Sequence, residues 1–119
     1  VGRRFEEAAA AWLEGHGLTV LDRNFHTRWG EIDLVAQQGD LIVFVEVRFR
    51  RSTRHGGAAA TVDGRKRRRL QAAAAEWLAR HPRRATAPCR FDVVALALRD
   101  GRLTGRWIRQ AFVAEDPEP

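Results

Sequence analysis

The sequence predicts a mixed α/β fold, in which a five-stranded sheet is flanked by two helices in the order helix, three strands, helix, two strands. Apolar residues recur with helical spacing in two separate segments. Two other segments are nearly continuous apolar runs rich in β-branched residues, as in buried strands. Short connections join other strands into hairpins, which indicates antiparallel pairing. We expect one domain over residues 1–119, because this length supports one hydrophobic core.

The two helices are predicted over residues 3–16 and from about 63 to 80. In each, the apolar residues follow the i, i+3, i+4, i+7, i+8 pattern of a face that packs on a core. Gly15 and Gly17 end the first helix, and Pro82 stops the second. The apolar residues are Phe5, Ala8, Ala9, Trp12 and Leu13 in the first helix, and Leu70, Ala73, Ala74, Trp77 and Leu78 in the second.

The five strands are predicted from apolar alternation, apolar runs and the turn residues between them. The pair Asp100–Gly101 is a turn signal, and the last strand is more polar, as expected at the edge of a sheet. The segment 51–61 has no periodicity and contains adjacent glycines, so we expect a loop there. The acidic segment 113–119 is expected to be a disordered tail. The predicted strands cover residues 18–25, 31–36, 41–49, 90–98 and 102–112.

Composition narrows the class of protein. Hydrophobic residues make up 45% and charged residues 30%, values typical of a soluble globular protein. No apolar run approaches the roughly 18 to 20 residues that cross a bilayer, so we expect no membrane partner. Cys89 is the only cysteine, and no group of His and Cys has zinc-ligand spacing. We therefore expect a protein of the reducing cytoplasm.

Positive charge is concentrated in one segment of the chain. Residues 48–69 include nine basic residues and one acid, a net charge of +8, whereas the whole chain carries +6. A focused basic segment in an otherwise mildly acidic domain indicates a polyanionic partner, and we expect a nucleic acid, DNA in the first place. The alternative is a solvated surface in an arginine-rich chain, because 20 of the 21 basic residues are arginine.

Glu46 interrupts the apolar strand 41–49. By strand alternation, its side chain shares a face with Ile42, Phe44 and Arg48. A carboxylate at such a position must be paired, hydrogen-bonded or metal-bound, because burying it alone costs several kcal/mol.

Asp33 is predicted to lie beside Glu46. With the four-residue connection between their strands as the turn, Ala36 pairs with Leu41 and Asp33 with Phe44, which places Asp33 diagonal to Glu46 at about 7 to 8 Å. Two carboxylates across that gap can share a hard divalent cation, and we expect Mg²⁺ or Mn²⁺, which take oxygen ligands.

Glu6 is the carboxylate of the first helix that is best placed to join them. It lies near Ala9 and Leu13 at the rim of the apolar face, whereas Glu7 lies on the solvent side.

A purely structural interpretation of these carboxylates stays open. In it, Glu46 forms a buried ion pair with Arg48 or Arg90, and Asp33 caps a local turn. Ion-pair networks produce buried carboxylates just as functional sites do.

Five blocks of the sequence resemble the bacterial YraN-like family, also called UPF0102. They occur in family order over residues 2–112, and GEIDLVA followed by FVEV at this interval is their most specific part. That family is similar to archaeal Holliday-junction resolvases and, more distantly, to PD-(D/E)XK nucleases, which implies a restriction-endonuclease-like core. The blocks are GRRFEEAAAAWLEGHGLTVLDRN, GEIDLVA, FVEVRFR, GRKRRRLQAAAAEWL and RFDVVAL.

The resemblance implies a role for each matching residue. It assigns the helix acid to Glu6 and the metal-binding acids to Asp33 and Glu46. It also implies that the backbone carbonyl of Val47 binds the metal and that Arg48 occupies the position of the motif's lysine.

Two residues depart from the family pattern. Arg48 stands where the family has lysine; an arginine contacts phosphate through two N–H groups, but it stays protonated and cannot act as a base. Phe5 stands where the family usually has glycine and adds bulk to the core.

Lys66, the only lysine, begins the second helix, where phosphate contact, approach to the site and plain solvation all stay open. Asp92 matches the family's RFD pattern, and pairing with a neighbouring arginine explains it as well.

Three functional hypotheses follow. The first is a divalent-metal-dependent endonuclease of the Holliday-junction-resolvase-like type, which hydrolyses phosphodiester bonds with a site that includes Glu6, Asp33, Glu46 and Arg48. The second is a nucleic-acid-binding module on the same fold that does not cut, and the third is a protein-interaction domain with an acidic partner. In the first two, the expected phosphate contacts are Arg50, Arg51, Arg65, Lys66, Arg68 and Arg69.

A homodimer would suit paired cuts in a branched substrate, because a two-fold axis presents two sites to it. The edge strand around Trp107 and Ile108 is the candidate surface for such a dimer.

Overall fold

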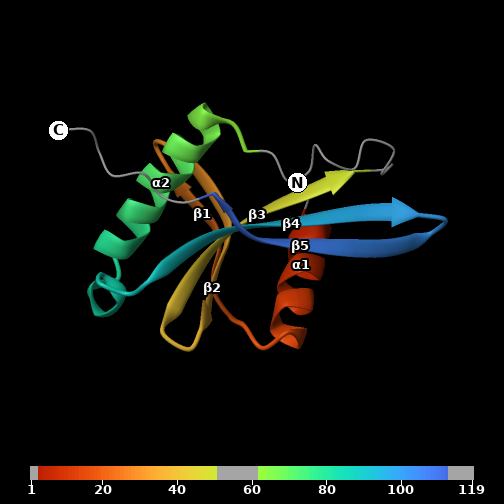
Figure 1. Cartoon of the computed structure of the whole chain (residues 1–119), viewed down its shortest axis with the longest axis horizontal. Helices are drawn as coiled ribbons and strands as arrows, with labels where there is room; N and C mark the ends of the chain where they lie inside the picture. Colours follow the sequence, from red (N-terminus) through yellow and green to blue (C-terminus); the bar gives the residue numbers. More distant parts are fainter. Residues whose placement is uncertain (1–2, 51–61, 113–119) are drawn as a thin grey trace.

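Helices on both faces of one five-stranded sheet form the architecture of the chain (Figure 1). We describe it from a computed structural model of residues 3–50 and 62–112. The predicted α/β layout is confirmed, whereas the predicted loop 51–61 and tail 113–119 lie outside the described residues. None of the described helices is long and apolar enough to cross a membrane. The elements are α1 (Arg3–Gly15), β1 (Thr19–Thr27), β2 (Gly30–Gln38), β3 (Leu41–Arg50), α2 (Gly64–Ala79), the short 3₁₀ helix η2 (Pro82–Arg84), β4 (Cys89–Arg99) and β5 (Arg102–Phe112).

The strands lie in the sheet in chain order, β1-β2-β3-β4-β5. Strands β3 and β4 are parallel and are connected through α2, and the other three neighbouring pairs are antiparallel. Strand β5 is therefore an edge strand, as its polar sequence predicts.

The register of β2 on β3 differs from the predicted one by two residues. Ala36 pairs with Val43, so its predicted pairing with Leu41 is wrong. The physical reason is the turn, because only Gly39 and Asp40 lie between the two strands. Gly39 has φ of 61°, a left-handed conformation that glycine adopts without strain. A two-residue turn of this kind closes most hairpins.

A shift of two residues does not by itself move a side chain to the other face of a sheet. One residue beyond the last pair, Leu34 with Val45, the register brings Asp33 opposite Glu46 instead of Phe44. Beyond that pair, β2 continues along β1, and β3 continues along β4. The sheet therefore forks at Asp33 and Glu46, between β2 and β3.

Each helix packs on its own core cluster. On the α2 side of the sheet, Trp77 packs with Phe44 and Val93; on the α1 side, Leu13 packs with buried valines of β3. The ring of Phe5 stacks on Phe49 with 3.8 Å between ring centroids. The two helices therefore approach the fork from opposite faces of the sheet.

Candidate active site

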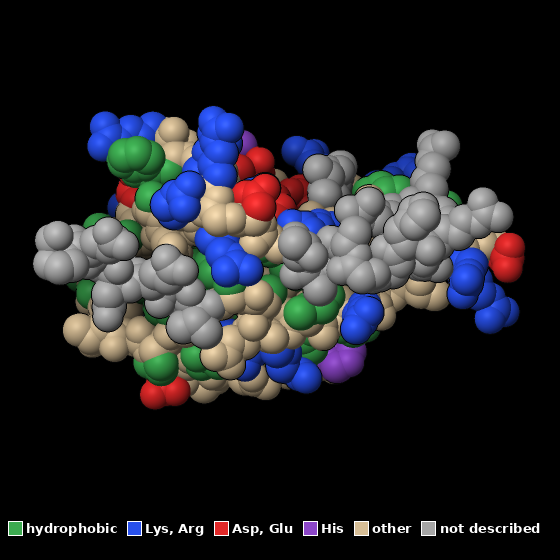
Figure 2. All heavy atoms as spheres, turned by 45° about the horizontal axis from the view of Figure 1, so that its top comes forward, with side chains coloured by type: hydrophobic (Ala, Val, Ile, Leu, Met, Phe, Trp, Pro, Cys, Tyr) green, Lys and Arg blue, Asp and Glu red, His purple; other side chains and the backbone are tan. Residues whose placement is uncertain are grey.

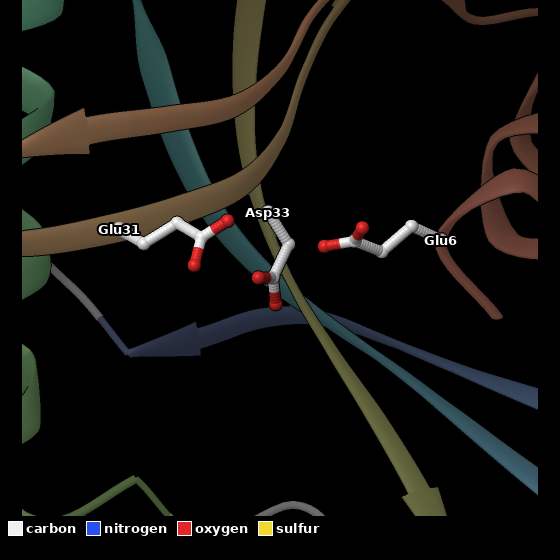
Figure 3. A group of neighbouring side chains, drawn as sticks. All are labelled: Glu6, Glu31 and Asp33. Carbon is white, nitrogen blue, oxygen red and sulfur yellow. The ribbon is translucent and has the colours of Figure 1, made fainter. Parts of the chain in front are cut away.

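Four carboxylates from three elements converge at the fork of the sheet. Glu6 comes from α1 and is only 6% exposed, Glu31 and Asp33 come from β2, and Glu46 comes from β3. One carboxylate oxygen from each of Glu6, Glu31 and Asp33 lies within 4.8 Å of the other two. Figure 3 shows the Asp33 side chain between the other two, whose carboxylates point toward it. The structure thus brings Glu6 and Asp33 together with Glu31, and Glu46 follows one residue beyond the last β2–β3 pair, opposite Asp33.

A main-chain hydrogen bond holds Asp33 in place. The backbone N–H of Val47 donates to its Oδ2 atom over 2.8 Å. Asp33 thus binds the neighbouring strand, so the predicted alternative in which it caps a local turn is wrong. The metal-binding role implied for the Val47 carbonyl stays a prediction.

The pKa of Asp33 is raised from its ordinary 3.8 to about 7. Burial is the largest cause, because it penalises the charged form. The negative charges of Glu46, Glu31 and Glu6 raise the pKa further, and the hydrogen bond from Val47 opposes them. The site therefore carries negative charge that a bound cation would compensate.

Glu46 meets the only lysine of the chain. Lys66 Nζ lies 3.2 Å from Glu46 Oε2, and the Glu46 side chain is 12% exposed. Glu46 Oε2 is buried and accepts no hydrogen bond from the described residues, so the contact is an ion pair without hydrogen-bond alignment. The start of α2 fixes this lysine, because Asp63 caps the helix and accepts a 2.8 Å hydrogen bond from the backbone nitrogen of Lys66. Of the three alternatives for Lys66, approach to the site is the one that the geometry supports.

A small pocket opens beside the carboxylates, between β2 and α2. Its lining includes one carboxylate and two cationic side chains, those of Glu31, Lys66 and Arg69. Its volume is about 80 Å³, enough for a few water molecules of about 30 Å³ each. An anion can therefore approach the carboxylate group along two basic side chains. Gly30 and Leu70 complete the lining.

The predicted phosphate contacts lie mostly on the first half of α2. Arg65, Arg68 and Arg69 are exposed there, and Figure 2 shows blue side chains over this helix, next to red carboxylates. Arg50 is the last residue of β3, and Arg51 lies outside the described residues. Of these arginines, Arg69 lines the pocket beside the carboxylates, and the phosphate contacts themselves stay a prediction.

Asp92 has a structural role. It is 2% exposed and accepts hydrogen bonds from Arg90 Nε and Nη2, Trp107 Nε1 and the Gln110 backbone nitrogen, at 2.8 to 2.9 Å. Arg90 is thus the partner of Asp92, and the predicted alternative in which Arg90 pairs with Glu46 is wrong. Asp92 joins β4 to β5 and lies apart from the metal-binding candidates.

The predicted dimer surface consists of side chains that pack within the chain. Trp107 lies edge-on against Trp12 of α1 with 5.8 Å between ring centroids, and Ile108 packs on the α2-side cluster. The homodimer itself stays a prediction.

Glu31 is the site residue that the sequence analysis missed. The predicted strand 31–36 begins at Glu31, and the strand pattern alone gives this residue no further role. The signal was present, because Glu31 and Asp33 are two positions apart in one strand and can share a face. Glu31 Oε1 also lies 3.8 Å from His26 Nε2, on a histidine side chain that is 74% exposed.

The sequence is similar to known proteins over nearly its whole length. Residues 5–96 match the family model described as "Uncharacterised protein family UPF0102". A UPF0102 protein of Halorhodospira halophila is 54% identical over 114 residues, which cover 96% of this chain and 88% of the relative. Those of Xanthomonas campestris pv. campestris and Alcanivorax borkumensis are 50% and 47% identical over 115 residues, covering 97% and 96% of this chain and 93% and 92% of the relatives.

Proposed function

This chain belongs to the UPF0102 family, and from the geometry of its site we propose that it is a divalent-metal-dependent endonuclease of the Holliday-junction-resolvase-like type. It hydrolyses phosphodiester bonds of a nucleic acid, and we propose DNA as the substrate. The observation that supports this proposal most is the meeting of four carboxylates and one lysine at the fork between β2 and β3.

The carboxylates fit a hard divalent cation. Mg²⁺ binds oxygen at 2.0 to 2.1 Å, so two ligand oxygens on opposite sides of it are about 4.2 Å apart. The 4.8 Å limit among the oxygens of Glu6, Glu31 and Asp33 is close to this separation. The pKa of Asp33 is raised by burial first and by the charges of Glu46, Glu31 and Glu6 second, and a bound cation would offset both causes. We assign Asp33 and Glu46 as metal ligands, with Glu6 and Glu31 as further donors.

Bound Mg²⁺ or Mn²⁺ supplies Lewis-acid stabilisation of the phosphate charge and lowers the pKa of a bound water. The protein fixes the donors that surround it. Val47 orients the Asp33 carboxylate through its N–H group. Glu6 is buried on α1, which restricts the conformations of its side chain. Such preorganised groups require no rearrangement during the reaction.

Lys66 supplies the ammonium group that is missing from the strand motif, where Arg48 occupies the lysine position. Its ammonium group already lies against Glu46 and borders the pocket, where it can hold Glu46 and contact a phosphate oxygen of the substrate. Arg48 follows Glu46 by two positions on the same face, so it can bind a phosphate through two N–H groups. Lys66 and Arg48 therefore together provide the positive charge that a single lysine would provide in the motif.

Affinity for the substrate comes from backbone phosphates. The exposed Arg65, Arg68 and Arg69 line one helix beside the pocket, and such contacts give binding that falls with salt and carries little base specificity.

The identity of Arg48 favours a second candidate function, a nucleic-acid-binding module that does not cut. Because an arginine cannot act as a base, this position alone cannot activate a water. The two candidates make opposite predictions for metal-dependent cleavage.

The test is incubation of the purified protein with labelled linear duplex, single-stranded and four-way-junction DNA, in Mn²⁺ or in EDTA. We expect cleavage in Mn²⁺ only, and its loss in Asp33→Asn and Glu46→Gln. Glu76→Gln is the matched control, because Glu76 pairs with Arg80 on α2, outside the carboxylate group. Salt-sensitive binding without cleavage in Mn²⁺ would establish the non-catalytic module instead.

A further inference from the structure

A row of side chains crosses β3, β4 and β5, two residues beyond Glu46 along β3. Arg48 pairs with Ala95 in the β3–β4 register, and Ala95 pairs with Arg106 in the β4–β5 register. Residues paired in register point to the same face of a sheet, and Arg48 shares its face with Glu46. Neighbouring strands are about 4.8 Å apart, so the backbones of the two arginines are about 10 Å apart, with an alanine between them.

This face is the α2 side of the sheet. Arg99, Arg102 and Arg106 are exposed on it, whereas Arg48 and Ala95 are half-buried and Ala97 is buried. Val93 and Ile108 pair with each other and both pack in the α2-side cluster. Trp107 packs in the α1-side cluster, so the alternation of β5 turns Arg106 to the α2 side. The closest backbone contacts of helix α2 are with β1 and β2, and Arg106 is exposed.

Two more arginines extend the row toward the end of the β4–β5 hairpin. Arg99 pairs with Arg102, and both are exposed. Each lies four positions from a member of the row on its own strand, so each has the same face. The side chains between the arginines are small, namely Ala97 and Thr104, which also pair with each other. The surface between the positive charges therefore lies low, as contact with a polymer backbone requires.

We propose that this surface binds the phosphate backbone of the nucleic-acid arm that extends from the cleavage site. We call it the arginine track and define it by Arg48, Arg99, Arg102 and Arg106. The proposal rests on the proposed function, because Glu46 marks the end of the track at which the backbone is cut. Figure 2 shows blue side chains toward the end of the hairpin as well as over α2.

The length and the chemistry of the track fit this occupant. From Val93, which pairs with Glu46, to Arg99 is six residues, or about 20 Å of strand. At 3.4 Å per base step, this is the length of about six base pairs. Guanidinium groups bind phosphate through two parallel N–H groups, which suits a repeating row of phosphates. The hairpin turn carries one acid, Asp100, at the far end of the track.

Two adjacent residues of β5 provide a matched test. Thr104 points to the track and Leu103 to the opposite face, both are exposed, and Leu103 is 44% exposed. Thr104→Glu and Leu103→Glu therefore add the same charge to the same strand on opposite faces. Binding of labelled four-way-junction and duplex DNA in EDTA is measured across a salt series, with thermal unfolding to confirm that both variants fold. We expect Thr104→Glu to weaken binding and Leu103→Glu to bind like the wild type.

Removal of the charges gives an independent measurement. Each phosphate contact contributes about 0.9 to the slope of log affinity against log salt. The double variant Arg102→Ala/Arg106→Ala should therefore lower the slope by about 2, and Arg106→Lys should keep it. Arg83→Ala, which removes an exposed charge in η2 at the other end of β4, should leave it unchanged.

The outcomes separate the track from the proposed function. An unchanged slope in the double variant, or equal loss of binding in Leu103→Glu and Thr104→Glu, would overturn the track while cleavage by the wild type still stands. Absence of salt-dependent DNA binding by the wild type in EDTA would overturn both. A lower slope together with a face-dependent effect of the two glutamates would establish the track.

Discussion

The Oδ2 atom of Asp33 lies 2.8 Å from the backbone nitrogen of Val47, so that a side chain joins β2 to β3 beyond the last main-chain pair. The two strands can therefore separate without leaving that N–H group unpaired. The gap between them holds the carboxylates, and the same hydrogen bond fixes one of the carboxylates that we assign to the metal.

Asp33 makes stability depend on pH. Its pKa of about 7 in the folded chain lies above its ordinary 3.8, so the folded state binds the proton more tightly. The contribution of Asp33 to stability is therefore complete below about pH 4 and is lost as pH rises toward and through 7. Asp33→Asn, whose amide oxygen can still accept the Val47 N–H, should gain stability relative to the wild type as pH rises. Urea unfolding of both proteins in EDTA at pH 5 and pH 8 measures this; a difference that is the same at both values would contradict the raised pKa.

Lys66→Ala should lower the rate of cleavage by about 100-fold, the effect of removing one donor of transition-state charge. Binding of Mn²⁺ should be retained or become tighter, because the substitution removes a positive charge beside Glu46. Single-turnover cleavage and calorimetry measure the two effects, with Arg83→Ala as a control for loss of one exposed charge. A Lys66→Ala enzyme that cuts at the wild-type rate would show that this lysine takes no part in the reaction.

Arg48→Lys should raise cleavage, because it restores to the strand an ammonium group that can lose its proton. Cleavage of four-way-junction DNA in Mn²⁺ measures it, with DNA binding in EDTA as the control. Intact binding with no cleavage in either protein would support the non-catalytic module.

Asp92→Ala should reduce the free energy of unfolding by about 3 to 5 kcal/mol, because it leaves the buried side of Arg90 and the Trp107 N–H without their acceptor. Glu7→Ala, on the exposed side of α1, should change it by less than about 0.5 kcal/mol. Urea unfolding measures both. A loss for Asp92→Ala as small as that for Glu7→Ala would show that the hydrogen bonds of Asp92 do not hold β4 to β5.

The fold was predictable because helical and strand periodicities are local properties, and β5 was predicted with the bounds that it has. The register of β2 on β3 was not, because it depended on how many residues the turn contains. Counting Gln37 and Gln38 in the turn displaced the pairing by two positions. The error left Asp33 and Glu46 on their predicted faces, since side chains alternate with a period of two.

The site was predictable only as far as single strands and helices determine it. The positions of Asp33 and Glu46 follow from alternation, and that of Glu6 from the helical face. The contact between Lys66 and Glu46 depends on where α2 starts and how it lies across the sheet. The segment before it, 51–61, contains no pattern that indicates this position. The alignment of the exposed β5 arginines with Arg48 also could not be predicted, because it depends on the register of β3, β4 and β5.

Titration of Mn²⁺ into the protein by calorimetry at pH 8 tests the central claim most directly, that the carboxylates at the fork bind a divalent cation. We expect a saturable heat for the wild type and for Glu76→Gln, and its loss in Asp33→Asn. No saturable heat for the wild type, or the same heat for Asp33→Asn, would contradict the metal site.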